Sequence, residues 1–373
     1  MPVPPLPLEL VALIVDHLAD DLQGEGSQIE GLRVALVCKD WLPLGQALCW
    51  RSVVLARGRD DIIVDYLSSR PHLLQLVKHL AILGRFEEED EAEGGTIMSL
   101  LERDDDAEEL RDLMVACAAL STLGFVTSFT VDFLHVASQA AFAVTLSTLH
   151  LVLMYGPGVA SFSPLAFATS LTSFTNLRDL DCKLGFFENQ AQPFNPSSTA
   201  SRQIALDNLS LAETSRMPTF FSTFSSVLAF AINFTALKDL SVEECSGAGV
   251  FASWLPSCSR LKTLLFAATD SVALNSFLPA LLDILPKLAA LEYLVVQNER
   301  FDGTDGSLTA KADTPALLPF ARLLAALPAE LVHVLFNGLY FDCRTEDLPL
   351  LAYTNRPETS QSEKEEQEEG GLT

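Results

Sequence analysis

Apolar residues recur along the interior of the chain in one short phrase, in which an apolar residue is followed three and five positions later by two more. Six clear copies begin at Leu146, Leu177, Leu206, Leu237, Leu261 and Leu291, and three weaker copies begin at Val77, Leu120 and Leu331. From Leu120 to Leu291 the copies begin 26, 31, 29, 31, 24 and 30 residues apart. Each copy predicts a short β-strand with its apolar side chains on one face.

Apolar segments with helical character lie between several of these strands, for example at residues 221–230, 276–285 and 317–327. A strand–helix unit cannot bury its apolar side alone, so successive units are expected to stack and share one core. Over about residues 77–343 the chain resembles leucine-rich repeat proteins. The Asn that this family carries after the strand is mostly absent, which leaves the subtype open. An α/β domain with an ordinary parallel sheet is the alternative.

The first 55 residues follow a different, helical pattern. Pro7 suits the first position of a helix, and apolar residues follow at helical spacing from Leu10 to Leu18. Helical spacing resumes from Leu32 to Trp41, and Pro43 begins a third short helix before the strand-like residues 51–55. Three short helices bury little apolar surface by themselves, so this unit needs a partner or a neighbouring domain to cover it.

The same residues resemble the F-box, in the form found in fungal proteins. The matching positions are Leu6, Pro7, Glu9, Leu10, Ile14 and Leu18, then residues 36–39 with Trp41, then Leu48, Trp50 and Arg51. The resemblance implies docking onto the Skp-type adaptor of a cullin-RING ubiquitin ligase, through Leu6, Pro7, Leu10, Ile14, Leu18, Val37, Trp41 and Leu48. Residues 19–29 depart from the family, because they are longer than its compact acidic turn and contain glycine. The alternative is a helical cap on the repeats.

Acidic residues give the chain a formal net charge of −25. Between Glu87 and Glu109, twelve acidic residues accompany Arg103, a local charge of −11, and between Glu358 and Glu369 six Glu accompany Lys364, a local charge of −5. We therefore expect a solvated acidic insertion at residues 86–109 and a disordered acidic tail at residues 358–373. Such a charge repels phosphate groups, so neither nucleic acid nor an anionic membrane surface is an expected partner.

Cysteine usage and the motif search indicate an intracellular protein that is not an enzyme. The seven cysteines are scattered, without a C-x-x-C pair, which is typical of reduced thiols in the cytoplasm or the nucleus. The sequence contains no phosphate-binding glycine loop, zinc-protease motif or nucleophile elbow. We therefore expect no catalytic residue, no metal and no cofactor. A hydrolase with a dispersed triad is a further alternative.

The residues that flank the middle apolar residue of each phrase should face away from the core and form a binding surface. The predicted target-binding residues are Asp179, Asp181, Asn208, Asp239, Tyr293 and His333. Towards the C-terminus Leu265, Val295 and Leu335 replace Asp and Ser, which predicts an acidic half and an apolar half. Such a groove suits a segment with Lys or Arg beside an apolar anchor. Alternatively, the C-terminal segment covers the last units, or the register is shifted.

The sequence thus predicts an α/β fold: a small three-helix F-box at residues 1–55, and then a leucine-rich repeat-like solenoid at residues 56–357. The predicted function is that of a substrate-recognition adaptor in an SCF-type cullin-RING ubiquitin ligase. Its partners would be the Skp-type adaptor with the cullin ligase core and an unknown protein target. The alternative is a leucine-rich repeat scaffold for protein interactions without a ligase.

Overall fold

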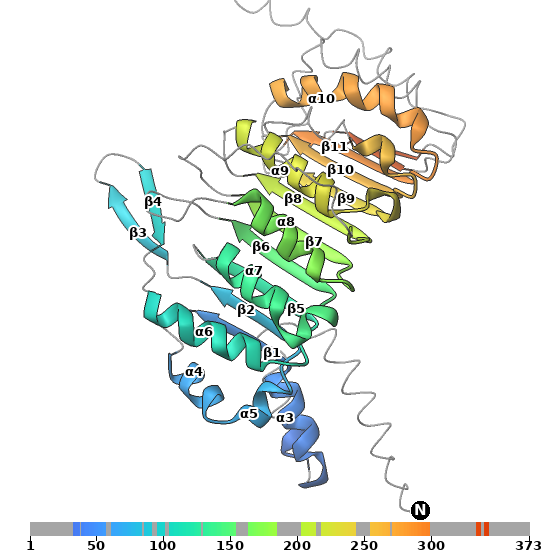
Figure 1. Ribbon diagram of the computed structural model, residues 1–373. Helices are drawn as coiled ribbons and strands as arrows, with labels where there is room; N and C mark the ends of the chain where they lie inside the picture. Colours follow the sequence, from blue (N-terminus) through green and yellow to red (C-terminus); the bar gives the residue numbers. More distant parts are fainter. Residues whose placement is uncertain are drawn as a thin grey trace, which may run out of the picture.

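A long β-sheet organises the computed structural model, which describes residues 33–37, 39–56, 61–83, 86–91, 95–100, 104–127, 130–153, 163–184, 203–213, 218–243, 254–268, 271–298, 333–336 and 339–342. Within these residues the sheet has eleven strands in the order β1-β2-β5-β6-β7-β8-β9-β10-β11-β12-β13, so the strands follow the order of the chain (Figure 1). Neighbouring strands are parallel from β1 to β12, and β13 pairs with β12 in the antiparallel sense.

The strands of this sheet are four to six residues long. They are β1 (Ser52–Ala56), β2 (His79–Leu83), β5 (Thr122–Thr127), β6 (Thr148–Leu153), β7 (Asp179–Leu184), β8 (Asn208–Glu213), β9 (Asp239–Glu243), β10 (Thr263–Ala268), β11 (Tyr293–Asn298), β12 (His333–Phe336) and β13 (Leu339–Asp342). All nine phrases therefore contain a strand, and the strand-like residues 51–55 contribute to β1.

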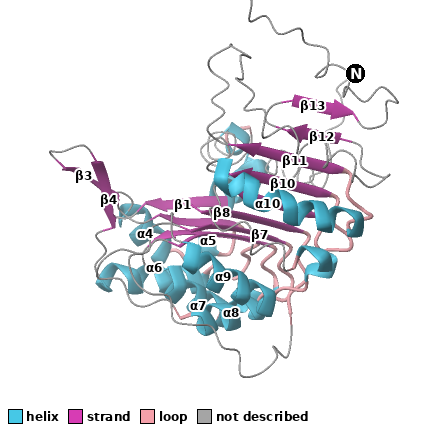
Figure 2. Ribbon diagram, turned by 90° about the horizontal axis from the view of Figure 1, so that it is seen from above, coloured by secondary structure: helices cyan, strands magenta, loops and turns pink. Residues whose placement is uncertain are grey.

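Helices lie between the strands, because a parallel strand pair needs a connection that crosses over one face of the sheet. The longer helices are α6 (Asp104–Ala116), α7 (Thr130–Gln139), α8 (Pro164–Ser173), α9 (Pro218–Ala231) and α10 (Ser271–Ile284). Shorter helical turns are η2 (Ala141–Val144), η3 (Phe234–Ala236), η5 (Leu255–Ser257) and η6 (Leu285–Lys287). Figures 1 and 2 show these helices on one face of the sheet.

Helical elements also precede β1 and follow it. The 3-10 helix η1 (Lys39–Trp41) leads into α3 (Leu42–Arg51), which ends where β1 begins, and α4 (Asp61–Ser68) and α5 (Pro71–Leu74) lie between β1 and β2. Pro43 stands in the first turn of α3, as expected. The expected helix up to Trp41 is interrupted instead, because residues 33–35 are helical and residues 36–37 form a turn.

The core lies between the sheet and these helices. One buried apolar residue per strand is in register across ten strands, and each is at most 3% exposed. They are Val53 of β1, which lies outside the phrases, and the middle residues of the nine phrases: Leu80, Leu123, Leu149, Leu180, Leu209, Leu240, Leu264, Leu294 and Val334. Aromatic residues join the layers, since Phe125 of β5 stacks on Phe133 of α7 with ring centroids 5.5 Å apart, and Phe266 of β10 stacks on Phe277 of α10 at 3.8 Å. The predicted α/β fold class is thus confirmed, and the parallel sheet with its intervening helices is compatible with the expected strand–helix repeats.

In addition to the hydrogen bonds between the strands, a row of main-chain hydrogen bonds links the residues just before each strand. The amide of Arg178 donates to the carbonyl of Ser147 at 2.8 Å, and the amide of Asp207 donates to the carbonyl of Arg178 at 2.8 Å. Equivalent bonds continue to Lys238, Lys262 and Glu292. This row fixes the register of each strand against the one before it.

The acidic segment at residues 86–109 contains regular structure. The strands β3 (Phe86–Glu91) and β4 (Gly95–Leu100) pair as an antiparallel hairpin, and α6 begins at Asp104. Asp104, Asp105 and Asp106 are the first three residues of α6, the end of a helix at which its dipole favours negative charge. Buried Leu110, Leu113 and Met114 follow at helical spacing and hold α6 on the core. Helix α6 therefore packs on the core like the other helices of the sheet, although the acidic residues at its start suggested a solvated segment.

The remaining boundaries of the predicted domains fall partly outside the described residues. The predicted end of the F-box at residue 55 lies within β1, so the helical segment and the sheet share this strand. The predicted helix at residues 317–327 and the predicted tail at residues 358–373 lie outside the described residues.

Two neighbouring leucines of β10 provide a matched test of the register. Leu264 is 1% exposed in the core, whereas Leu265 lies on the other face and is partly exposed. We expect Leu264→Ala to lower the free energy of unfolding by about 2–5 kcal/mol, because it leaves a cavity. The matched variant Leu265→Ala should lower it by less than about 1 kcal/mol. Urea denaturation monitored by circular dichroism measures both, and a larger loss for Leu265→Ala would place the strand in the opposite register.

Candidate functional site

The face of the sheet opposite the helices, called here the open face, carries the other side chains of the strands. Its first row consists of Ser52, His79, Thr122, Thr148, Asp179, Asn208, Asp239, Thr263, Tyr293 and His333. Its second row consists of Val54, Ala81, Gly124, His150, Asp181, Ser210, Ser241, Leu265 and Val295. All six predicted target-binding residues therefore belong to these two adjacent rows.

The middle of the open face, on β7 to β9, is acidic. Asp179, Asp181, Asp239 and Glu243 contribute four carboxylates, and Lys183 contributes one ammonium group. These four carboxylates are partly buried, whereas Lys183 is exposed. Because partly buried charges are screened less than fully solvated ones, this part of the face favours positively charged ligands.

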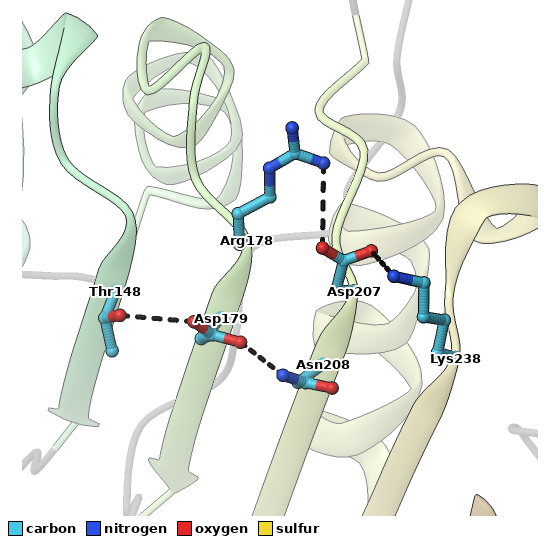
Figure 3. Close-up of polar contacts among 6 residues, drawn as sticks. All are labelled: Thr148, Arg178, Asp179, Asp207, Asn208 and Lys238. Atoms are coloured by element: carbon cyan, nitrogen blue, oxygen red, sulfur yellow. Dashed lines mark hydrogen bonds and ion pairs between the residues drawn. The ribbon is translucent and has the colours of Figure 1, made fainter. Parts of the chain in front are cut away.

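Asp179 joins three neighbouring strands through hydrogen bonds (Figure 3). The Thr148 hydroxyl donates to Oδ2 of Asp179 at 3.2 Å, and the Asn208 side-chain amide donates to Oδ1 of Asp179. Both donors are uncharged, so they orient the carboxylate without neutralising it. Asp179 and Asn208 therefore form a fixed acidic position on the surface.

Asp181 lies one row further along β7, beside His150 of β6. Oδ2 of Asp181 is 3.4 Å from Nδ1 of His150. Burial alone would raise the pKa of Asp181, but hydrogen bonds with His150 and Ser210 and the nearby charges of His150 and Lys183 hold the pKa below its ordinary value. The carboxylate is therefore ionised at neutral pH.

Charged side chains at the start of the strands form a rim beside the open face (Figure 3). Asp207 pairs with two cations: its Oδ2 is 3.6 Å from Nη1 of Arg178, and its Oδ1 is 2.9 Å from Nζ of Lys238. Further along, Nζ of Lys262 is 2.8 Å from Oε1 of Glu292. Solvated pairs of this kind contribute little to stability. Their main effect is to hold Arg178 and Lys238 beside Asp207.

The C-terminal end of the open face is aromatic and apolar. The ring of Tyr293, which is 43% exposed, lies 4.9 Å from that of His333, and Leu265 and Val295 are partly buried in the next row. The predicted change from acidic to apolar residues along the face thus appears in the placement of these side chains. The side chain of Leu335 lies outside the described residues.

The predicted adaptor-binding residues are only partly described. Leu6, Pro7, Leu10, Ile14 and Leu18 lie outside the described residues. Val37 is 59% exposed, and Trp41 is partly buried.

Leu48 differs from these residues, because it is 2% exposed and packs with Val34, Trp41 and Leu44 in a small cluster. In this conformation Leu48 holds α3 to the preceding turn, and its side chain is not available to a partner. The exposed apolar surface lies instead at Leu36, which is 84% exposed, and at Leu42, which is 46% exposed.

A pocket that sequence reasoning missed lies at the N-terminal end of the open face. It has a volume of about 240 Å³, and its lining includes Val54, Ala81, Gly124, Val126, His150 and Val152. The sequence signal was the small pair Ala81 and Gly124, which stand at equivalent positions of neighbouring repeats. Small residues at these positions leave space on the surface that larger side chains fill elsewhere.

Burial makes three of the described cysteines, Cys117, Cys182 and Cys258, poor candidates for a nucleophile. Burial raises the pKa of Cys117 and of Cys258 to about 12. Burial, with the charge of Asp181, also raises the pKa of Cys182. These thiols stay protonated at neutral pH and are weak nucleophiles, since the thiolate is the reactive form.

Two other kinds of site are absent from the part of the chain that the structure describes. There, no group of three or more His, Cys, Asp or Glu residues is placed to hold a metal ion. No helix within that part has the length and hydropathy of a membrane span.

Comparison with known proteins gives no relative: the chain matches no protein-family model and no curated protein.

The interaction between His150 and Asp181 predicts a measurable pKa change. We expect His150→Ala to raise the pKa of Asp181, because it removes the strongest of the interactions that lower this pKa. Since the folded-state pKa lies below that of the unfolded chain, about 3.9, the resulting stabilisation is complete above that value and is lost as the pH falls through the folded-state pKa. The variant should therefore lose stability less steeply below about pH 4.

Carboxyl NMR titration of the Asp181 side chain measures this change directly. The control variant is Thr148→Ala, which changes a residue on the same strand as His150. It removes a hydrogen bond to Asp179 and should leave the pKa of Asp181 unchanged. An unchanged pKa of Asp181 in His150→Ala would show that burial and Lys183 determine its ionisation instead.

Proposed function

We propose that this chain is the substrate-recognition subunit of an SCF-type cullin-RING ubiquitin ligase. In this proposal the N-terminal helical segment is an F-box that docks on the Skp-type adaptor, and the leucine-rich repeat-like sheet holds a protein target on its open face. The observation that carries the proposal is the open face, whose outward side chains form continuous rows across ten parallel strands.

The chemistry of the open face supports the binding of a protein segment. Ordered, in-register positions such as Asp179, with its hydrogen bonds to Thr148 and Asn208, present a rigid surface that loses little entropy on binding. Four carboxylates and one ammonium group on β7 to β9 favour a basic segment. The aromatic pair Tyr293 and His333 offers contacts of the kind that anchor protein interfaces.

Exposed apolar side chains support docking by the segment that precedes β1. Leu36, Val37 and Leu42 are 84%, 59% and 46% exposed, and they lie within seven residues of the chain. Neighbouring exposed apolar side chains commonly mark a surface that a partner covers. These residues belong to the stretch that resembles the F-box, which supports the adaptor as that partner.

The connection between α3 and β1 supports a mechanism based on positioning. The helix ends at Arg51 and the strand begins at Ser52, with no intervening linker. Trp50 packs against the core of the sheet and stacks on Tyr66 of α4, with ring centroids 5.6 Å apart. A bound target would therefore be held at a fixed place relative to the docking segment, which raises the local concentration of its lysines near the ligase.

A pull-down with purified Skp-type adaptor tests the docking step. We expect Val37→Glu to reduce adaptor binding by about tenfold or more, because it places a charge in the apolar contact. The matched control is Ile62→Glu, which changes another exposed apolar residue, 83% exposed on α4. Circular dichroism verifies that both variants are folded.

Two results would contradict the docking step. If the intact chain does not bind the adaptor, the ligase assignment is wrong, and the chain is better described as a repeat scaffold for protein interactions. If Val37→Glu and Ile62→Glu bind equally well, the adaptor contacts a surface other than the F-box-like stretch.

A further inference from the structure

The pocket at the N-terminal end of the open face exists because two neighbouring positions carry alanine and glycine. Ala81 of β2 and Gly124 of β5 are neighbours in the second row, and His150 of β6 follows them. The residues around this gap are largely apolar, with Val54, Val126 and Val152 among those lining the pocket. The acidic middle of the face begins immediately beyond it, because Asp181 also contributes to the lining.

Gly124 has no local reason to be glycine. Its backbone is not in the left-handed region, and an added Cβ would lie 3.6 Å from Cβ of Ala81 and 3.8 Å from Cβ of His150, which are ordinary contacts. Glycine within a strand weakens it and often marks a site where a ligand or another chain approaches closely. Glycine at position 124 thus leaves a space that a larger side chain could occupy.

The size and lining of the pocket indicate one apolar side chain as its ligand. A volume of about 240 Å³ is below the roughly 300–1,000 Å³ that is usual for small-molecule sites. Nine of the fourteen lining residues are apolar or glycine, and the polar ones are Ser52, His79, Thr122, His150 and Asp181. An anchor residue of a peptide fits these features better than a free metabolite does.

The distance from the pocket to the acidic residues sets the spacing of such a peptide. Neighbouring strands are about 4.8 Å apart, so Asp181 on β7 lies two strands, about 10 Å, from Gly124 on β5. An extended chain advances about 3.3 Å per residue, so three residues cover this distance. Asp239 on β9 lies four strands from Gly124, which corresponds to about six residues.

We propose that the Gly124 pocket receives an apolar side chain from an extended, basic segment of the target protein. In this arrangement the segment crosses the strands and places Lys or Arg three and six residues from the anchor, over Asp181 and Asp239. The inference rests on the proposed recognition function and specifies the ligand of its open face.

Charge favours another protein over segments of this chain as the occupant. Residues 1–32 contain six acidic residues and no Lys or Arg, and residues 343–373 contain eight acidic residues and three basic ones. A second copy of the chain would bring a net charge of −25 to an acidic surface. Like charges brought together at an interface are unfavourable, so a basic partner complements the face best.

Fluorescence anisotropy with short labelled peptides and the intact chain tests the inference. The peptides carry one Leu with Arg three and six residues away, in a Gly-Ser background and in both chain directions. We expect binding of these peptides, and about tenfold weaker binding when Leu is replaced by Gly or when the Arg residues are replaced by Glu.

Variants of the chain then locate the anchor. Gly124→Val should weaken binding about tenfold by filling the pocket, and the smaller Gly124→Ala should weaken it less. Asp181→Asn should also weaken binding and reduce its dependence on salt. The control is Ala229→Val, which adds apolar bulk at an exposed position of helix α9, on the other side of the sheet, and should change the affinity by less than about threefold. The urea midpoint of each variant verifies its fold.

Each other outcome overturns the inference in a distinct way. If the peptide binds Gly124→Val and the unchanged chain with equal affinity, the pocket does not receive the anchor, although basic peptides would still be ligands of the open face. Displacement of the basic peptide by a synthetic peptide of residues 1–32 would assign the pocket to this chain itself. Failure of every peptide to bind at about 1 mM would reject a basic ligand. Adaptor binding, measured separately, is unaffected by any of these results.

Discussion

The burial of one apolar residue per unit, in register with those of the neighbouring units, is the constraint on which the whole structure depends. Leu180 is buried because Leu149 and Leu209 lie beside it and the helices cover all three. No unit could achieve this burial alone. Because side chains alternate between the two faces of a strand, the register that places these residues in the core also places Asp179 and Asp181 on the open face. The core and the open face are therefore two consequences of one alignment.

Much of this architecture follows from the sequence alone, because the residues on the two faces of each strand alternate along the sequence. The spacing of the apolar residues located nine strands, and the alternation assigned all six residues predicted to bind a target to one face. Helix α6 escaped notice because its first turns are acidic, and its buried Leu110, Leu113 and Met114 show helical spacing only beyond the charge run. The hairpin of β3 and β4 has no counterpart in the repeat, so the repeat could not predict it.

The pocket around Gly124 escaped the sequence analysis for a different reason. It consists of space left by small residues of β2 and β5, which are far apart in the sequence and adjacent only after the strands align. Nor could the sequence distinguish a partner-facing Leu48 from a buried one, because both fit the same helical spacing. Its packing with Val34, Trp41 and Leu44 follows from the turn at residues 36–37, which replaces the continuous helix that periodicity suggested.

The antiparallel pairing of β13 with β12 has a consequence for how the array ends. A stack of parallel units has no inherent limit, because each last strand presents the same unpaired edge as the one before it. Reversing the direction of the final strand breaks that equivalence: a further unit of the same kind would meet an edge whose hydrogen-bonding groups are arranged differently from those of β12. Among the described strands, the reversed β13 therefore does not offer a further parallel unit the edge that β12 would offer.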